Sequence, residues 1–289
     1  MSLTIPAGLA AVAADPTVAA WLERLPNIIE ELVDRWQIDL DRSAPFAQAS
    51  CSWVAPAVRR DGTHVVLKIG LPLMPSRHEI DGLRFWNGRP TVRLLEADGP
   101  HETHNALLLE RCEPGTPLAE LLPEPKQDEI IASLLRRLWR TPPDPHPFRP
   151  LSEVTDGTAE GATRDLADCP DAGLLREGIR LFQELPWTAP EAVLLATDLH
   201  AWNVLRTDRE EWLVIDPMPF VGDPAYDATQ HLLNCEDRLR THPLGTVARM
   251  AELLEIDTQR LRWWMFARLA VMSRGGKHKK LYELACGLA

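Results

Sequence analysis

Long apolar runs, paired cysteines and an excess of positive charge are all missing from this sequence of 289 residues. No stretch reaches the ~18–20 consecutive apolar residues of a membrane span. The five cysteines are widely spaced and include no Cys-x-x-Cys pair, which argues against a disulfide framework and a structural zinc site. The N-terminal segment has no basic region and so does not resemble a signal peptide. We therefore expect a cytoplasmic globular protein.

The charge balance restricts the partners. Lys and Arg number 31 against 42 Asp and Glu, for a net charge of −11. Nucleic acids and anionic membranes attract basic faces, so neither is expected as a partner. A cationic small molecule suits this charge, although acidity also serves solubility alone. We expect a small-molecule substrate and a monomer or weak dimer.

The first part of the chain predicts a sheet with helices. Apolar residues recur at spacings of three and four over 17–36, which indicates an amphipathic helix. Two strand-like runs at 47–58 and 64–69 are joined through Asp61-Gly62, a turn typical of hairpins. The remaining predicted elements of this part are a helix at 75–86 beginning near Ser76 and strands at 91–97 and 106–109.

The second part predicts helices. A polar segment ending in Pro114-Gly115 separates it from the first part. This change of pattern predicts an α+β protein with an N-terminal lobe at 1–110, a hinge at 111–116 and a helical C-terminal lobe at 117–289. The predicted elements are helices at 130–138, 174–185, 225–233, 247–254 and 259–273 and short strands at 193–195 and 212–215.

The chemistry is concentrated in Asp198-Leu-His-Ala-Trp-Asn203 and in Asp216 beyond the next strand. Phosphoryl transfer needs a carboxylate that orients the attacking hydroxyl and oxygen ligands for magnesium. On a tight loop, Asp198 can face the acceptor while Asn203 and Asp216 face the metal ion. Taken singly, each residue is equally typical of a turn or a helix cap; their arrangement between two strands favours the catalytic interpretation.

The segment from Leu194 to Asn234 resembles the aminoglycoside phosphotransferases, whose loop reads H-G-D-x-H-x-x-N. Its Ile-Asp-Pro at Asp216, in place of Asp-Phe-Gly, is closest to the streptomycin 6-phosphotransferase and hydroxyurea phosphotransferase branch. VVLKIG and ALLLERCEPGTPL extend the likeness over about residues 40 to 275. The resemblance implies a two-lobed protein-kinase-like fold that binds ATP and magnesium between its lobes.

Two positions depart from the family pattern. Ala196 and Thr197 stand where the family has His and Gly, and the missing His would brace the loop. Positioning of the loop is therefore in question rather than its chemistry. Asp227, in the following helix, is expected to bond back to this loop. His200 can support the loop or approach phosphate.

Lys68 matches the family's strand lysine, which contacts the α- and β-phosphates. Its apolar neighbours in the sequence predict burial, which is costly for an ammonium group without an anionic partner. Glu79 on the next helix is the expected partner. The alternatives are an edge-strand lysine that points to water and a solvated helix glutamate.

The phosphate loop and the adenine hinge are less distinct. No glycine-rich loop is present, and the small residues Ser50 and Ser52 stand in its place, where a plain β-turn is the alternative. The resemblance places the adenine-binding hinge at Glu110 to Glu113, so Glu110 and Cys112 are candidate cofactor-binding positions. Three aromatic residues receive structural roles: Trp202 is expected to pack beneath the loop, and Trp263 and Trp264 to lie in the core.

The expected function is ATP-dependent phosphorylation of a hydroxyl group on a small cationic molecule, with an aminoglycoside such as streptomycin as the leading candidate. Acidic stretches at 152–171 and at Asn234, Glu236 and Asp237 are candidate acceptor sites, with ordinary surface residues as the alternative. Two other functions stay open: a housekeeping kinase for a sugar, amino alcohol or glycated amine, and a silent nucleotide-binding protein. A protein kinase is less consistent with the sequence because no activation segment follows Asp216.

Overall fold

The computed structural model describes residues 3–41, 45–46, 51–71, 78–101 and 103–289. The chain falls into two compact units. Unit 1 comprises residues 1–115 and 206–213, and unit 2 comprises residues 116–205 and 214–289. Unit 1 holds the larger sheet and unit 2 most of the helices, so the α+β prediction is confirmed.

Unit 1 is built on a five-stranded antiparallel sheet in the order β1-β2-β3-β5-β4. The predicted hairpin is present: Val58 pairs with His64 across a turn in which Gly62 has a φ of +85°, a conformation that glycine adopts without steric cost. The edge strand β1 was not predicted because three residues are too few to show a period. The strands are β1 (Ile38–Leu40), β2 (Ser52–Arg59), β3 (His64–Gly70), β4 (Leu94–Asp98) and β5 (Asn105–Glu110).

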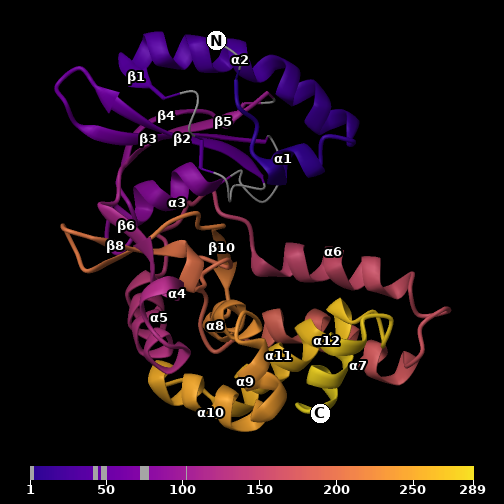
Figure 1. Ribbon diagram of the computed structural model, residues 1–289. Helices are drawn as coiled ribbons and strands as arrows, with labels where there is room; N and C mark the ends of the chain where they lie inside the picture. Colours follow the sequence, from indigo (N-terminus) through magenta and orange to yellow (C-terminus); the bar gives the residue numbers. More distant parts are fainter. Residues whose placement is uncertain (1–2, 42–44, 47–50, 72–77, 102) are drawn as a thin grey trace. The chain divides into compact units, whose positions relative to one another are not determined.

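Helices cover both faces of this sheet (Figure 1). The helix α2 (Pro16–Trp36) begins at the N-cap Asp15, whose side chain accepts from the amide of Thr17. Its apolar stripe packs with the sheet residues Trp53 and Leu67 in one core. On the other face lies α3 (Glu79–Trp86), while the predicted N-cap Ser76 falls outside the described residues. A short helix, α1 (Ala7–Ala11), precedes α2.

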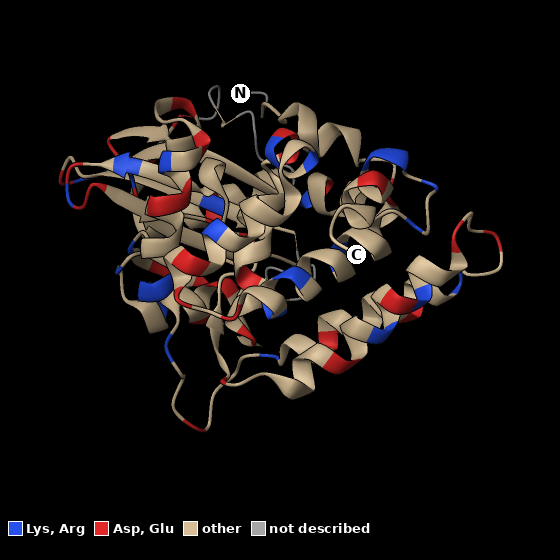
Figure 2. Ribbon diagram, turned by 90° about the horizontal axis from the view of Figure 1, so that it is seen from below, with Lys and Arg blue, Asp and Glu red and all other residues tan. Residues whose placement is uncertain are grey.

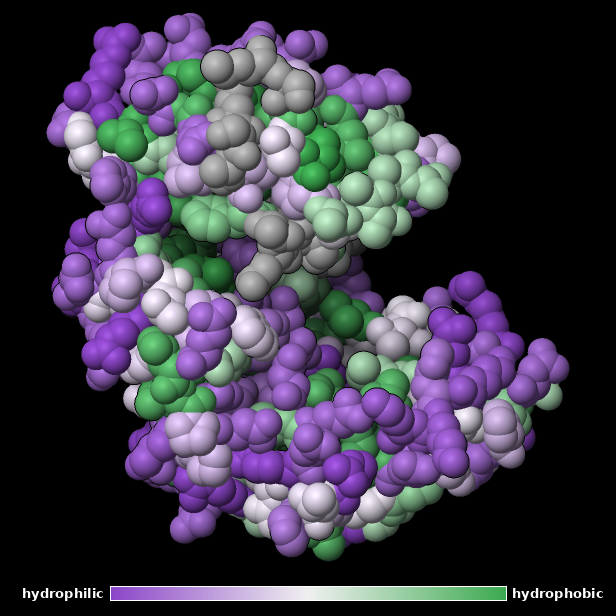
Figure 3. Space-filling model, viewed as in Figure 1, coloured by the Kyte–Doolittle hydropathy of each residue, from purple (hydrophilic) through white to green (hydrophobic). Residues whose placement is uncertain are grey.

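Unit 2 is organised around α11, which packs against α7, α8, α10 and α12. Trp264 on this helix is fully buried with its ring edge-on to Tyr226, whereas Trp263 is 43% exposed, so the prediction of a core pair is wrong for Trp263. The face of unit 2 in Figure 3 is mostly hydrophilic, as expected for helices with inward apolar sides. The helices are α4 (Leu118–Leu121), α5 (Glu124–Leu138), α6 (Leu151–Thr163), α7 (Ala172–Glu184), α8 (Pro224–Leu233), α9 (Glu236–Thr241), α10 (Pro243–Leu254), α11 (Thr258–Met272) and α12 (Lys279–Cys286).

Short strands hold the loops that matter for the chemistry. In unit 2, β7 (Val193–Leu195) pairs with β10 (Phe220–Gly222). A second small sheet has the order β6-β8-β9, and the division between the two units falls within its strands. Those strands are β6 (Pro114–Pro117), β8 (Val204–Thr207) and β9 (Trp212–Val214).

The surface is consistent with the charge analysis. In the view of Figure 2, Lys and Arg are interspersed with Asp and Glu along the described helices. Among the described residues, no helix combines the length and apolar character needed to cross a membrane.

Gly178 sets the distance between α7 and α11. A Cβ added there would lie 2.7 Å from the Cβ of Ala270, and both atoms belong to packed helices that cannot move cheaply. We expect Gly178→Ala to lower the free energy of unfolding by about 1–3 kcal/mol through overpacking, measured by thermal denaturation.

Gly157 is the matched control, because a Cβ there meets nothing within 4 Å and the residue lies within α6. Gly157→Ala should leave stability unchanged or raise it by up to about 1 kcal/mol through helix propensity. Equal effects of the two substitutions would contradict the packing argument.

Candidate active site

Main-chain hydrogen bonds bring the predicted catalytic residues together. Asp198 follows β7, Asn203 ends a 3-10 turn before β8, and Asp216 follows β9. The amide of Ile215, next to Asp216, donates to the carbonyl of Asn203 at 3.0 Å. The amide of Met218 donates to the carbonyl of Ala196 at 2.8 Å. These two bonds join the segment that holds Asp198 and Asn203 to the segment that holds Asp216, and the catalytic roles of the three residues stay predictions.

The two oxygens of the Asp198 carboxylate are held unequally. Oδ1 accepts from Nε2 of Gln230 at 2.8 Å, whereas Oδ2 accepts a longer hydrogen bond from Nδ2 of Asn203 at 3.4 Å. Burial raises the pKa of Asp198 above its usual range, and the nearby Asp216 carboxylate adds to this. Oδ2 is thus the more weakly bonded of the two oxygens.

The oxygen atoms that this site offers as ligands fit magnesium. Nδ2 of Asn203 donates to the main-chain carbonyl of Asp198 at 3.0 Å, which leaves the amide oxygen as the atom for a metal ion. Together with the Asp216 carboxylate, this gives the hard oxygen ligands that magnesium prefers. Burial lowers the pKa of the nearby His200 below its usual range, which disfavours a positive charge beside the proposed metal ligands.

Asp227 holds the catalytic loop, the segment 196–203 that carries Asp198 and Asn203, through two main-chain amides. It is fully buried, and its carboxylate accepts from the amides of Ala196 at 3.0 Å and Thr197 at 2.6 Å and from the indole of Trp139 at 3.0 Å. The prediction that this acid bonds back to the loop is confirmed. Burial raises the pKa of Asp227 to about 6, so the group is mostly ionised at pH 7.

Thr197 joins the same loop to the Asp216 segment. It adopts a φ of +51°, where a residue with a side chain is strained, and its hydroxyl donates to the carbonyl of Met218 at 2.6 Å. The loop is therefore held by Asp227, whose carboxylate also accepts from Trp139, and by the Thr197 hydroxyl, although Ala196 supplies no support through its side chain. Trp202 is 45% exposed on this loop, so the expectation that it packs beneath the loop is wrong.

In unit 1, Lys68 and Glu79 form the expected ion pair, with Nζ 2.6 Å from Oε1 and both side chains less than 10% exposed. Lys68 lies in β3, between β2 and β5, with Val54 and Leu107 as its pairing partners. The alternative of an edge-strand lysine is therefore wrong. The role of this pair at the phosphates stays a prediction.

The remaining cofactor positions have mixed outcomes. Ser50 falls outside the described residues, and Ser52 is buried in β2. The Glu110 carboxylate accepts from Arg209 at 2.5 Å and from the amide of Arg93 at 2.9 Å, so its side chain serves unit 1. Burial raises the pKa of the Cys112 thiol to about 12, which makes it unreactive. Backbone binding of adenine at this segment remains a prediction.

The predicted acceptor residues lie around the end of α8. Asn234 is exposed and donates to the carbonyl of Gln230 at 2.9 Å. Glu236 and Asp237, in the first turn of α9, are exposed and paired with Lys280 at 3.7 Å and Arg240 at 3.0 Å. Their role toward an acceptor stays a prediction. Most of the acidic stretch 152–171 forms α6, which was not predicted.

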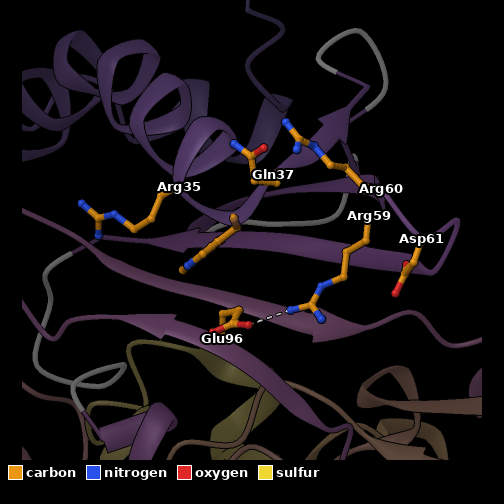
Figure 4. A pocket seen from close by; sticks show the side chains of 7 residues that line it. Arg35, Gln37, Arg59, Arg60, Asp61 and Glu96 are labelled. Carbon is orange, nitrogen blue, oxygen red and sulfur yellow. Dashed lines mark hydrogen bonds and ion pairs between the residues drawn. The ribbon is translucent and has the colours of Figure 1, made fainter.

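A surface pocket on unit 1 is a separate feature. Figure 4 shows Arg35, Arg59 and Glu96 among its lining, with Arg59 donating to Glu96 at 2.8 Å. None of the residues predicted to bind ATP, metal or acceptor lines it. This pocket is therefore not the candidate active site.

Sequence reasoning missed Gln230, Arg268 and Trp139. Gln230 lies three residues after Asp227, so both project from one face of α8 toward the loop. That spacing was visible in the sequence. Trp139 directly follows α5 and Arg268 lies in α11, and nothing local in the sequence marks either residue.

We expect Asp227→Asn to lower kcat and to destabilise the protein by about 1–3 kcal/mol at pH 7, because an amide group replaces one carboxylate oxygen that accepts N–H bonds. Activity assays and thermal denaturation measure the two effects.

The pH dependence gives a second measurement. The folded pKa of about 6 exceeds the ordinary 3.8, so wild type has extra stability at low pH that disappears as the pH rises through 6. The stability gap between wild type and Asp227→Asn should therefore widen from pH 7 to pH 4, by up to about 3 kcal/mol. A gap that narrows would show that the pKa is lowered instead.

The comparisons with known proteins agree with this geometry. The family model "Aminoglycoside/hydroxyurea antibiotic resistance kinase" matches residues 35–275. The chain is 36% identical to a streptomycin 6-kinase of Streptomyces glaucescens, over 86% of this chain and 82% of that one. It is 35% identical to a hydroxyurea phosphotransferase of Kitasatospora aureofaciens, over 86% and 72% of the two chains.

A solved structure shows the same fold. An aminoglycoside phosphotransferase of Streptomyces rimosus, in complex with ADP and streptomycin, superposes with a TM-score of 0.57 at 18% identity. The match covers 87% of this chain and 98% of that one. The predicted protein-kinase-like fold is therefore confirmed.

Proposed function

The chain belongs to the aminoglycoside/hydroxyurea antibiotic resistance kinase family, and on this premise we propose that it transfers the γ-phosphoryl group of ATP to a hydroxyl of streptomycin or a related aminoglycoside. The arrangement around Asp198 carries the proposal. Oδ1 of its carboxylate accepts from Gln230 at 2.8 Å, and Oδ2 accepts only a longer bond from Asn203 at 3.4 Å. Such a carboxylate can orient an acceptor hydroxyl beside a metal-bound triphosphate.

The proposed reaction is a direct transfer. The acceptor oxygen bonds to the γ-phosphorus while the bond from that phosphorus to the β-phosphate oxygen breaks, which releases ADP. Oδ2 of Asp198 accepts the hydroxyl proton. When bound at Asn203 and Asp216, magnesium would neutralise phosphate charge. Lys68, held by Glu79, is proposed to contact the α- and β-phosphates.

Two acceptors are favoured by specific observations. The relatives named as streptomycin 6-kinases and the net charge of −11 favour a cationic aminoglycoside. The relative named as a hydroxyurea phosphotransferase favours hydroxyurea as a second candidate. The braces on the catalytic loop argue against the silent nucleotide-binding alternative, since they support the loop despite Ala196.

The acceptor is tested by measuring ATP consumption and the phosphorylated product with streptomycin, hydroxyurea and choline in parallel. We expect turnover with streptomycin and a loss of at least about 100-fold in kcat for Asp198→Asn, which keeps the size of the side chain but cannot take the proton. Turnover with choline alone would contradict the proposed acceptor. Near-normal activity of Asp198→Asn would contradict the mechanism.

The role of Lys68 is separated from its structural contribution by a double variant. Lys68→Met should lower kcat/KM for ATP by about 100-fold or more and also lower Tm, because the buried Glu79 carboxylate loses its partner. Adding Glu79→Leu should restore Tm without restoring activity. Lys126→Met on an exposed turn of α5 is the control and should change neither quantity. Recovery of activity in the double variant would show that Lys68 acts through stability alone.

A further inference from the structure

The catalytic carboxylate is connected to a helix that sequence motifs do not mark. Nε2 of Gln230 donates to Oδ1 of Asp198 at 2.8 Å, and Oε1 of Gln230 accepts from Nη2 of Arg268 at 2.6 Å. Gln230 comes from α8 and Arg268 from α11. A continuous hydrogen-bonded chain therefore runs from α11 through α8 to the catalytic loop.

Arg268 determines which way the amide of Gln230 points. A guanidinium has five N–H donors and no acceptor, so its partner on Gln230 must be the carbonyl oxygen. The amide nitrogen is then left to face Asp198. Without Arg268 the amide can rotate by 180° and present its oxygen to the carboxylate, which would repel it.

Arg268 is itself held in place. Its Nη1 donates to the hydroxyl of Thr229 at 2.6 Å, and its guanidinium lies over the ring of Tyr226, 4.8 Å from the centroid. Both partners lie on α8, which α11 contacts. The cation is thus fixed by a hydrogen bond and a cation–π contact.

We propose that Arg268 and Gln230 are positioning residues that select the reactive orientation of Asp198: Gln230 occupies Oδ1 and so reserves Oδ2 for the acceptor hydroxyl. This inference rests on the proposed function, because it assigns a task to Asp198. A carboxylate with one fixed oxygen has fewer orientations to lose on reaching the transition state, so the effect belongs in kcat rather than in nucleotide binding.

The first test replaces the donor. Gln230→Leu should lower kcat roughly 10- to 100-fold, the range expected for one hydrogen bond to a charged group, and leave KM for ATP within about twofold. Gln259→Leu on the exposed side of α11 is the matched control and should have wild-type kinetics. A KM effect without a kcat effect would overturn the proposal.

Gln230→Glu separates positioning from simple bracing. A glutamate keeps the contact with Arg268, but it offers no donor to Asp198 and places a second carboxylate beside it, so kcat is measured across a pH profile. If Gln230 only ties α8 to α11, kcat should return to the wild-type value once the pH is high enough to ionise Asp198. The proposal requires kcat to stay at least as low as in Gln230→Leu over the whole profile, and full activity at high pH would overturn it.

A double-mutant cycle tests whether Arg268 acts through Gln230. Arg268→Met should lower kcat about 5- to 50-fold in the wild-type background and less than twofold in the Gln230→Leu background. Arg268→Lys, which can still donate to Oε1, should recover part of the activity. Fully additive effects of the two substitutions would overturn the coupling.

The same variants distinguish this inference from the proposed acceptor. If wild type does not phosphorylate streptomycin, the acceptor is wrong, and the comparison is made on the slow hydrolysis of ATP, in which Asp198 orients water instead of a hydroxyl. Lower hydrolysis by Gln230→Leu than by wild type, with unchanged binding of ADP in calorimetry, supports the inference. Equal hydrolysis overturns it.

Discussion

The buried carboxylate of Asp227 is the constraint on which the candidate active site depends. An ionised group with no exposure to water is tolerated only when its oxygens are occupied, and here two loop amides and one indole occupy them. Because those amides belong to Ala196 and Thr197, the catalytic loop cannot move from α8 without leaving a buried charge unpaired. The position of Asp198 follows from the position of α8.

The helix α8 is in turn fixed from its other side. His231 and Arg238 both bond to Asp128 on α5, at 3.0 Å and 2.7 Å, and Asp128 is fully buried. Burial alone would raise the pKa of Asp128, yet these partners lower it to about 2. Its oxygens therefore bond to residues of α8, α9 and α10, so Asp128 forms a structural junction among these helices.

Local chemistry was predictable and distant chemistry was not. The Asp61-Gly62 hairpin is encoded by neighbours in the sequence, so pattern and turn chemistry were sufficient to predict it. The set of Asp198, Asn203 and Asp216 was selected by its spacing between two strands, and its catalytic role stays a prediction. The helix α6 was missed because Gly157 and Gly161, together with its threonines, lower helix propensity, and packing against α7 overrides this. Arg268 reaches the active site only through tertiary packing of α11, which no local pattern reports.

The missing loop histidine shows how such distant contacts change the interpretation of a motif. Ala196 contributes only its main-chain amide, and that amide is the group Asp227 accepts from. At the next position Thr197 carries the strain of a positive φ, and its hydroxyl bond to Met218 compensates. Support for the loop therefore comes from the Asp227 carboxylate and the Thr197 hydroxyl instead of from a histidine side chain at position 196. A departure from a catalytic motif indicates lost activity only when the structure offers no other group for the same task.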